Sequence, residues 1–410
     1  MIRKIGIFVL SVFLFLVLLG TGLVQAQGGL IILNSWTETE FPSNLHFNLL
    51  AESDVDITDV RLHYNVSRAS YAEVTSEVYI EFVSDTIIDV QWAWDMRKTG
   101  GLPSGSVVEY WWTVEDASGN RIETTPTRVQ FDDSRYSWHN LTEGKVTIYW
   151  YEGKHGFAEE LMVAARQALV RLTEDTGAYL KESIKIYVYA NAGDLQGAMI
   201  FPQEWTGGAT YTRYGIIVIG IAPHNLSWGK RAIAHELTHL VIHQMTFNPY
   251  AGMPTWLDEG LAMYAEGVLG TEFTNYLKMA IAANSLISVR GLSSPFSSYA
   301  AESRLSYAQS YSLVEFLISN YGQGKILELL SNFSEGSSYN GALERVYGLD
   351  MDGLDTLWRS YVIRRYQGDG VTTAAALLVP IGASTKLAGR PLFALDYIFP
   401  NVISCPIFKY

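Results

Sequence analysis

The chain has 410 residues, of which 48% are hydrophobic, and a formal net charge of −13. The apolar content is enough for packed cores and excludes wholesale disorder, while the length allows two or three domains. Because binding to a nucleic-acid backbone needs clustered Lys and Arg, the acidic balance argues against a nucleic-acid partner.

The N-terminal segment has the pattern of a secretory signal peptide. Arg3 and Lys4 precede an apolar run over residues 5–19, and Val24-Gln25-Ala26 offers a cleavage site, so residues 1–26 are the predicted signal peptide. The apolar stretch to Val24 is about 20 residues, long enough to span a bilayer. Membrane anchoring through an uncleaved N-terminal segment therefore stays open as an alternative. In both cases we expect the rest of the chain to be extracytoplasmic, either secreted or anchored and facing outside.

Residues 28–133 have the pattern of an all-β unit. Residues 107–115 alternate in hydrophobicity, and the polar segment 116–120 supplies the turn of a hairpin. Short strands separated by turn signals predict an immunoglobulin-like or fibronectin-like β-sandwich. The predicted strands are 44–51, 58–64, 75–82, 86–94, 107–115 and 121–131.

Four tryptophans of this unit, Trp92, Trp94, Trp111 and Trp112, could form a carbohydrate-binding platform. Because alternate side chains of a strand face opposite sides of a sheet, we expect about half of them in the core instead. A ligand-binding role for this unit stays an alternative.

Residues 134–367 form the second predicted unit, which begins with mixed α and β patterning. Strands are predicted at 145–151, 184–189 and 215–221, and helical spacing over 157–172 is terminated by Gly177. The segment 207–211 is a candidate edge strand, whose unpaired backbone could hold an extended peptide. A plain glycine-rich turn is the alternative.

The sequence Ala234-His235-Glu236-Leu237-Thr238-His239 contains the pattern H-E-x-x-H. On a helix, His235 and His239 lie one turn apart on one face, as a metal needs. Glu236 is rotated by about 100° from His235, so it can contact a water at the metal without being a ligand. We expect Ser227 to cap this helix and Asn248 with the following proline to end it.

The third ligand decides the class of metal site. A metzincin needs a glycine at position 242 and a histidine at 245, but the chain has Ile242 and Met245, which excludes that class. A glutamate on a following helix is the other common solution. Glu259 lies 20 residues after His239, and Glu266 shares its face of the predicted helix. Pro254 suits the first turn of that helix.

His-Glu-Leu-Thr-His followed by Pro-x-Trp-Leu-Asp-Glu-Gly-Leu-Ala-x-Tyr resembles the gluzincins, and more closely the bacterial peptidase MA-like metallohydrolases, over roughly residues 145–366. The resemblance implies an α+β zincin-like peptidase domain in which Zn²⁺ is held by His235, His239 and Glu259, with Glu236 as the general base. Thermolysin-like enzymes carry an Asp four residues after the ligand Glu, where this chain has Met263. The groups that orient the ligand histidines must therefore come from elsewhere.

The chain beyond Glu259 has helical spacing and predicts a helical C-terminal lobe. Tyr307 is a candidate donor to the oxyanion of the reaction, although a core tyrosine is the alternative. We expect residues 368–410 to be a disordered tail or a loose surface segment. Their apolar run over 374–383 is too short to span a membrane. Cys405 is the only cysteine, so no intrachain disulfide can form. The predicted helices are 271–283, 304–321, 325–333, 337–347 and 353–366.

These features predict a secreted zinc metallopeptidase acting on a peptide or protein substrate. We expect an endopeptidase, because gluzincin aminopeptidases carry a Gly-x-Met-Glu-Asn segment and residues 207–211 contain no carboxylate. The alternatives are an extracytoplasmic binding protein or a cell-surface adhesion protein with a vestigial metal site. Glu236 argues against the binding protein, because a structural zinc needs no base. Binding of an insoluble glycan by residues 28–133 alone would favour the adhesion protein. The sequence carries no indication of oligomeric state.

Overall fold

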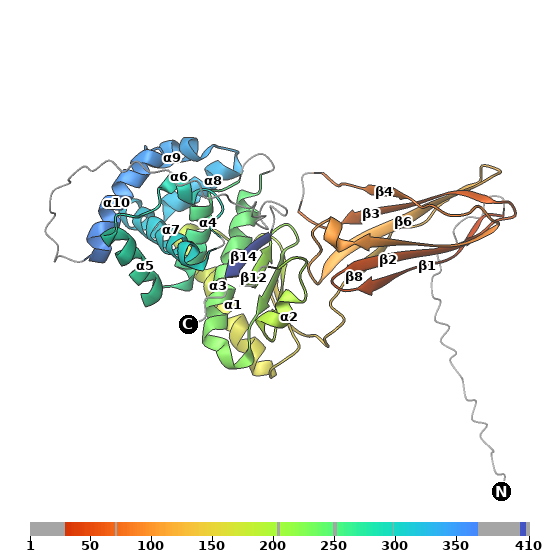
Figure 1. Cartoon of the computed structure of the whole chain (residues 1–410), viewed down its shortest axis with the longest axis horizontal. Coiled ribbons are helices and arrows are strands. Elements are labelled where there is room, and N and C mark those ends of the chain that lie inside the picture. Colours follow the sequence, from red (N-terminus) through yellow and green to blue (C-terminus); the bar gives the residue numbers. More distant parts are fainter. Residues whose placement is uncertain are drawn as a thin grey trace, which may run out of the picture.

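The computed structural model describes residues 29–69, 72–202, 206–248, 252–297, 299–367 and 402–406. The predicted signal segment lies outside these residues. No helix in the described part of the chain combines the length and the hydrophobicity that crossing a bilayer requires. Figure 1 shows a sheet-rich N-terminal region beside a second region, in which a sheet is followed by a lobe of helices.

The N-terminal region consists of two antiparallel sheets, one with the order β1-β2-β5 and one with the order β4-β3-β6-β7, with β8 also pairing with β6. The first strand was not among those predicted, and the run predicted over 121–131 is divided into two strands. The strands are β1 (Ile31–Glu40), β2 (Asn44–Glu52), β3 (Ile57–Val66), β4 (Ser76–Tyr79), β5 (Ile87–Asp95), β6 (Ser106–Asp116), β7 (Arg121–Glu123) and β8 (Thr127–Phe131).

Both sheets contribute to one hydrophobic core. Trp94 and Trp112 are buried in it, whereas Trp92 and Trp111 are partly exposed. The ring of Trp111 stacks on His63, with centroids 5.4 Å apart. Trp92 shares the face of β5 with Trp94 and also packs against this core, where its ring centroid lies 5.9 Å from that of Phe47. Alternation along β6 separates Trp112 in the core from Trp111 on the other face.

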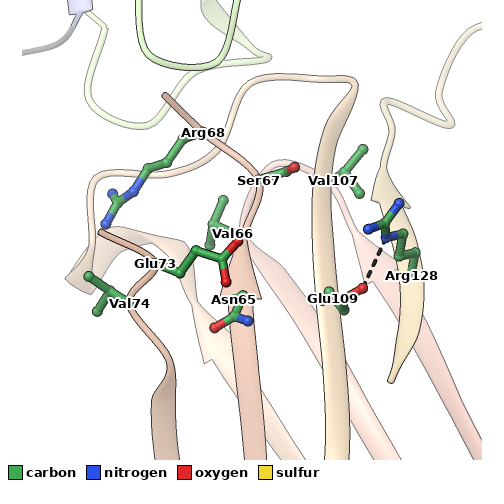
Figure 2. A pocket seen from close by; sticks show the side chains of 9 residues that line it. All are labelled: Asn65, Val66, Ser67, Arg68, Glu73, Val74, Val107, Glu109 and Arg128. Atoms are coloured by element: carbon green, nitrogen blue, oxygen red, sulfur yellow. Dashed lines mark hydrogen bonds and ion pairs between the residues drawn. The ribbon is translucent and has the colours of Figure 1, made fainter. Parts of the chain in front are cut away.

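A small polar pocket of about 140 Å³ lies where β3 ends and β6 begins (Figure 2). The Arg128 guanidinium at its rim donates to Glu109, with Nε and Oε1 3.0 Å apart. Close by, the backbone N–H of Ala69 donates to the carbonyl of Arg213 at 2.7 Å. The pocket therefore adjoins a contact between the two regions, and none of the predicted site residues lines it.

The second region is built on a six-stranded sheet with the order β14-β12-β13-β11-β10-β9. The pairs β9–β10, β12–β13 and β12–β14 are antiparallel, and the other two pairs are parallel. The strands are β9 (His139–Glu143), β10 (Val146–Trp150), β11 (Ile184–Tyr189), β12 (Thr206–Tyr211), β13 (Ile216–Gly220) and β14 (Val402–Pro406).

Two long helices, α1 (His155–Thr176) and α3 (Leu226–Thr246), share a hydrophobic core with this sheet, and the short helix α2 (Ala192–Gln196) contributes to a second core. Gly177 ends α1 in the left-handed conformation with φ of 72°, which confirms its predicted role. The predicted cap at Ser227 is wrong. Because a 3₁₀ turn over Pro223–Asn225 leads directly into α3, Asn225 occupies the N-cap position and Ser227 lies in the first turn.

The helical lobe follows α3 and shares a core with the end of that helix. Where α4 packs against α7, a Cβ on Gly260 would lie 2.5 Å from the carbonyl oxygen of Ser310. Only glycine permits this close approach, which fixes the neighbouring Glu259. The helices are α4 (Thr255–Glu266), α5 (Thr271–Ala282), α6 (Val289–Leu292), α7 (Ala300–Tyr321), α8 (Gly324–Ser334), α9 (Tyr339–Tyr347) and α10 (Met351–Gln367).

The prediction of a disordered tail is wrong for residues 402–406, which form β14 against β12. The candidate edge strand 207–211 is indeed a strand, but β14 covers its outer edge, so it is not the edge of the sheet. The physical reason is that Val402 and Ile403 are β-branched and suit a strand once a partner backbone is available. The rest of the tail lies outside the described residues.

Candidate metal centre

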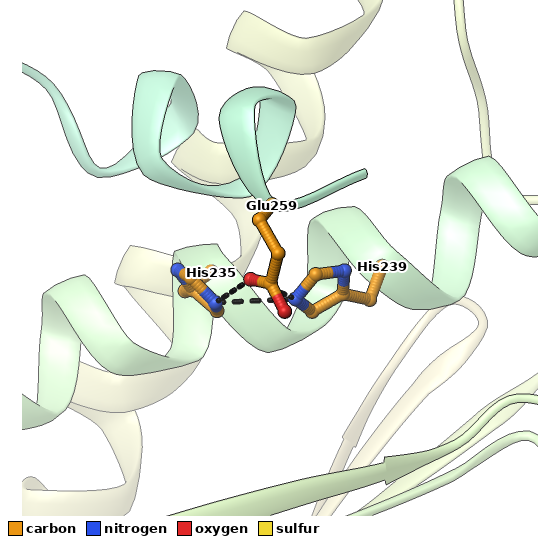
Figure 3. A group of neighbouring side chains, drawn as sticks. All are labelled: His235, His239 and Glu259. Carbon is orange, nitrogen blue, oxygen red and sulfur yellow. Dashed lines mark hydrogen bonds and ion pairs between the residues drawn. The ribbon is translucent and has the colours of Figure 1, made fainter. Parts of the chain in front are cut away.

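The structure brings the three predicted metal ligands together. His235 and His239 project from α3, and Glu259 projects from α4 toward them (Figure 3). One possible ligand atom of each residue lies within 4.8 Å of the others, and all three residues are buried. The two histidines of α3 and the glutamate of α4 therefore form one cluster.

The distances within this cluster fit a tetrahedral metal. The two Nε2 atoms of His235 and His239 are 3.1 Å apart, and each lies 3.4 Å from Oε2 of Glu259. Zinc binds histidine nitrogen and carboxylate oxygen at about 2.1 Å, so two of its tetrahedral ligand atoms are about 3.4 Å apart. The three atoms are thus separated as ligands of one zinc ion would be.

Hydrogen bonds on the far side of each imidazole set its tautomer. Nδ1 of His235 lies 2.8 Å from Oε1 of Glu266, and Nδ1 of His239 lies 2.9 Å from Oδ1 of Asp258. A proton on Nδ1 leaves Nε2 with a lone pair when the ring is neutral. The two lone pairs and the Glu259 carboxylate then face one another, and Oε2 of Glu259 accepts no hydrogen bond from any described residue. Such an arrangement is repulsive unless a cation lies among the three atoms.

Asp258 and Glu266 therefore supply the orienting carboxylates that could not be named from the sequence. They replace the aspartate missing at Met263. Asp258 also accepts from Nε2 of His243 at 2.9 Å, which links a third histidine to the site. In the sequence Asp258 directly precedes Glu259, and Glu266 lies two helical turns after Glu259, but neither position by itself indicates a contact with a histidine of α3.

The electrostatics of the cluster favour a positive charge. Burial lowers the pKa of His239, but the charges of Asp258 and Glu259 outweigh burial and raise it to about 10. Burial raises the pKa of Asp258, but the charges of His243 and His239 hold it well below its usual range. The surrounding carboxylates thus favour the protonated form of His239 in the absence of a metal. A metal ion would replace this proton on binding.

The predicted base, Glu236, is buried where α3 faces β12. Its Oε2 accepts a hydrogen bond from Oγ1 of Thr210, and its Oε1 is buried without a hydrogen-bond partner among the described residues. A Cβ on Gly208 would lie 2.8 Å from that Oε1. Burial raises the pKa of Glu236, although the charges of His235 and His239 oppose this. Gly208 and Thr210 were predicted only as part of a candidate edge strand that could hold a peptide, and their contacts with Glu236 were not predicted.

Tyr307 lies at the site on α7, with its ring centroid 6.5 Å from that of His235. Its hydroxyl donates to Oε1 of Glu259 at 3.4 Å, a long hydrogen bond. The hydroxyl is thus directed at the carboxylate of a candidate ligand. A role as oxyanion donor stays a prediction.

The profile of the peptidase MA superfamily matches residues 164–364, which include α3, α4 and the whole cluster. This part of the chain belongs to the peptidase MA superfamily. Membership supports a metallopeptidase and implies peptide or protein substrates. The two histidines and the glutamate of the superfamily domain are consistent with zinc.

Comparison with solved structures gives weak likenesses. A mutant M1 zinc metallopeptidase from Deinococcus radiodurans aligns at 11% identity over 80% of this chain and 94% of that chain, with a TM-score of 0.34. A two-domain M1 zinc metallopeptidase mutant bound to L-arginine aligns at 11% identity over 81% of this chain and 94% of that chain, with a TM-score of 0.36.

An inactive OgpA from Akkermansia muciniphila, in complex with an O-glycopeptide substrate, aligns at 8% identity over 26% of this chain and 30% of that chain, with a TM-score of 0.20. The alignment thus spans under a third of OgpA. At these scores the three likenesses have no bearing on function. No curated protein matches the chain.

Proposed function

We propose that the protein is a zinc-dependent metallopeptidase that cleaves internal peptide bonds outside the cytoplasm. The observation that carries the proposal is the convergence of Nε2 of His235, Nε2 of His239 and Oε2 of Glu259 at 3.1 to 3.4 Å. The location rests on the signal pattern of residues 1–26 alone.

His235, His239 and Glu259 would hold the metal. When bound, zinc polarises a substrate carbonyl and lowers the pKa of a water molecule to about 7. Oε1 of Glu236 has no hydrogen-bond partner among the described residues, so it can accept the proton of the attacking water and pass it to the leaving amine. The raised pKa that burial gives Glu236 strengthens it as a base. Thr210 holds the other oxygen of this carboxylate in place.

The endopeptidase assignment rests on β12. An aminopeptidase of the gluzincin type needs a carboxylate that pairs with the free amine of its substrate, and β12 has none. Affinity would come instead from the backbone of an extended peptide and from side-chain pockets. For the N-terminal region we propose an immunoglobulin-like or fibronectin-like β-sandwich fold and a non-catalytic role.

Metal analysis and digestion of a peptide library test the proposal together. We expect one zinc per chain, and Glu259→Ala should lose most of it because a ligand is removed. The substitution Asp352→Ala, at an exposed carboxylate on α10, is the matched control and should keep the metal. A zinc-loaded protein that cleaves no peptide would contradict the proposal and favour a binding or adhesion protein with a vestigial site.

A second experiment separates endopeptidase from aminopeptidase action. One peptide is digested with a free and with an acetylated N-terminus. We expect similar cleavage of both at internal bonds. Stepwise loss of residues from the free peptide, with no cleavage of the acetylated one, would overturn the endopeptidase assignment.

A further inference from the structure

The strand β12 is the part of the sheet that lies against the predicted base. Thr210 donates to the Glu236 carboxylate, and Gly208 leaves the space that Oε1 of Glu236 occupies. All six residues of β12 are buried. A peptide that paired with the outer edge of β12 would therefore lie beside the residues proposed to carry out the reaction.

That outer edge is already paired within the chain. On one side β12 pairs with β13, and on the other side with β14 from the C-terminal tail. β14 is antiparallel to β12, and the register places Ser404 opposite Ala209 and Ile403 opposite Thr210. The backbone groups that would bind an extended substrate are consequently taken up by residues 402–406.

We propose that β14 is an autoinhibitory segment, which occupies the substrate-binding edge of β12 and is displaced when a peptide substrate binds. This inference rests on the proposed function. The segment and the substrate would form the same kind of backbone pairing, and the segment would compete through its high effective concentration.

The shortness of β14 makes the exchange feasible. It has five residues and ends at Pro406, which has no N–H to donate to a neighbouring strand. A strand at the edge of a sheet is held by one partner only. Residues 368–401 connect α10 to β14, so the segment stays attached to the molecule after it leaves the edge.

Competition of this kind predicts a specific kinetic signature. When only the open form binds substrate, the apparent affinity is reduced by the fraction of open molecules. Weakening β14 should therefore lower KM and leave kcat unchanged. If β14 were instead a permanent structural strand, weakening it would reduce both kcat and stability.

The first test uses the full chain with Ile403→Pro, since proline removes a backbone N–H and is poorly tolerated in a strand. The matched control is Ile403→Val, which keeps the backbone and the β-branched side chain. We expect Ile403→Pro to lower KM for a peptide on the order of tenfold at unchanged kcat, and Ile403→Val to behave as the parent chain. Equal KM in all three proteins, or a fall in kcat together with the melting temperature, would overturn the inference.

The second test does not depend on turnover. Hydrogen exchange is followed by mass spectrometry in zinc-loaded Glu236→Gln, with and without a saturating peptide. We expect faster exchange in residues 402–406 when the peptide is bound, because their amides lose β12 as a partner.

The two tests separate the two hypotheses. Slower exchange in α3 or β12 on peptide addition, with no change in residues 402–406, would show binding without displacement and overturn the inference alone. Loss of peptide cleavage in every variant, with the exchange response present, would contradict the proposed reaction and leave the displacement standing. No exchange response anywhere would overturn the inference.

Discussion

Nδ1 of His239 lies 2.9 Å from Oδ1 of Asp258, the residue directly before the candidate ligand Glu259. Adjacent residues of α4 thus perform two tasks, since one is placed to bind the metal and the other orients a ligand from α3. A shift of α4 would disturb both at once. The same carboxylate reaches His243, so three residues of α3 and α4 are joined beneath the site.

Asp258→Ala should weaken zinc binding, because His239 loses the group that fixes its tautomer and orientation. We expect a loss of about 10–100-fold in zinc affinity or in activity. His243→Ala is the graded comparison. It removes a partner of Asp258 but no direct contact with either ligand histidine, so it should keep its zinc with a smaller loss. Titration against a chelator measures both, and an Asp258→Ala affinity equal to that of the parent chain would contradict the orienting role.

Glu236→Gln should keep its zinc and lose turnover. The amide has nearly the shape of the carboxylate but cannot accept the proton of a water molecule. Removal of a general base costs roughly 10²–10⁴-fold in rate. The check is kcat on a peptide, with zinc content measured on the same sample. Substantial activity in this variant would show that the base lies elsewhere.

Gly208→Ala should lower kcat while zinc stays bound. The added Cβ would lie 2.8 Å from Oε1 of Glu236, so the carboxylate or β12 must move. Misplacement of a reacting group by about 1 Å can cost about a hundredfold in rate. Gly324→Ala on α8 is the control, because nothing lies within 4 Å of its added Cβ. Equal kcat in the two variants would show that Gly208 does not position the base.

Residues 28–133 should fold without metal when produced alone. Their core has contributions from both sheets of the N-terminal region, and among the described residues the hydrophobic side chains of the second region packed against it are Ile200 and Tyr214. We expect a β-type circular dichroism spectrum and a cooperative thermal transition that a chelator does not change. A span that is unfolded, or that requires zinc to fold, would refute the division at residue 133.

Local sequence signals predicted the elements that carry the site. The spacing of His235 and His239 indicated one helix face, and the predicted strand at 184–189 has the bounds that the structure gives to β11. The roles of Asp258 and Gly208 were not predictable in the same way. Both roles depend on which helices and strands meet in the folded protein. A single aspartate or glycine adds nothing to the hydrophobic periodicity from which elements are predicted.

The pairing of β14 with β12 could not be predicted from the sequence, for a related reason. Residues 402–406 are too few to give a clear alternation, and their partner β12 is distant in the chain. Only the open edge of a finished sheet distinguishes such a segment from a loose tail. The same limit explains why 207–211 was predicted to be at the edge of the sheet, since nothing local to that segment indicates a covering strand.

The contact of Thr210 with Ile403 also sets an order of assembly. Contacts between residues far apart in the sequence carry the largest loop-closure entropy and form late. The helical lobe and the other five strands can therefore be complete before β14 arrives. Until then β12 has an unpaired edge, which is a template for pairing with a second chain. Pairing of β14 with β12 would cover this edge. The last strand to form would therefore also prevent newly folded molecules from aggregating through β12.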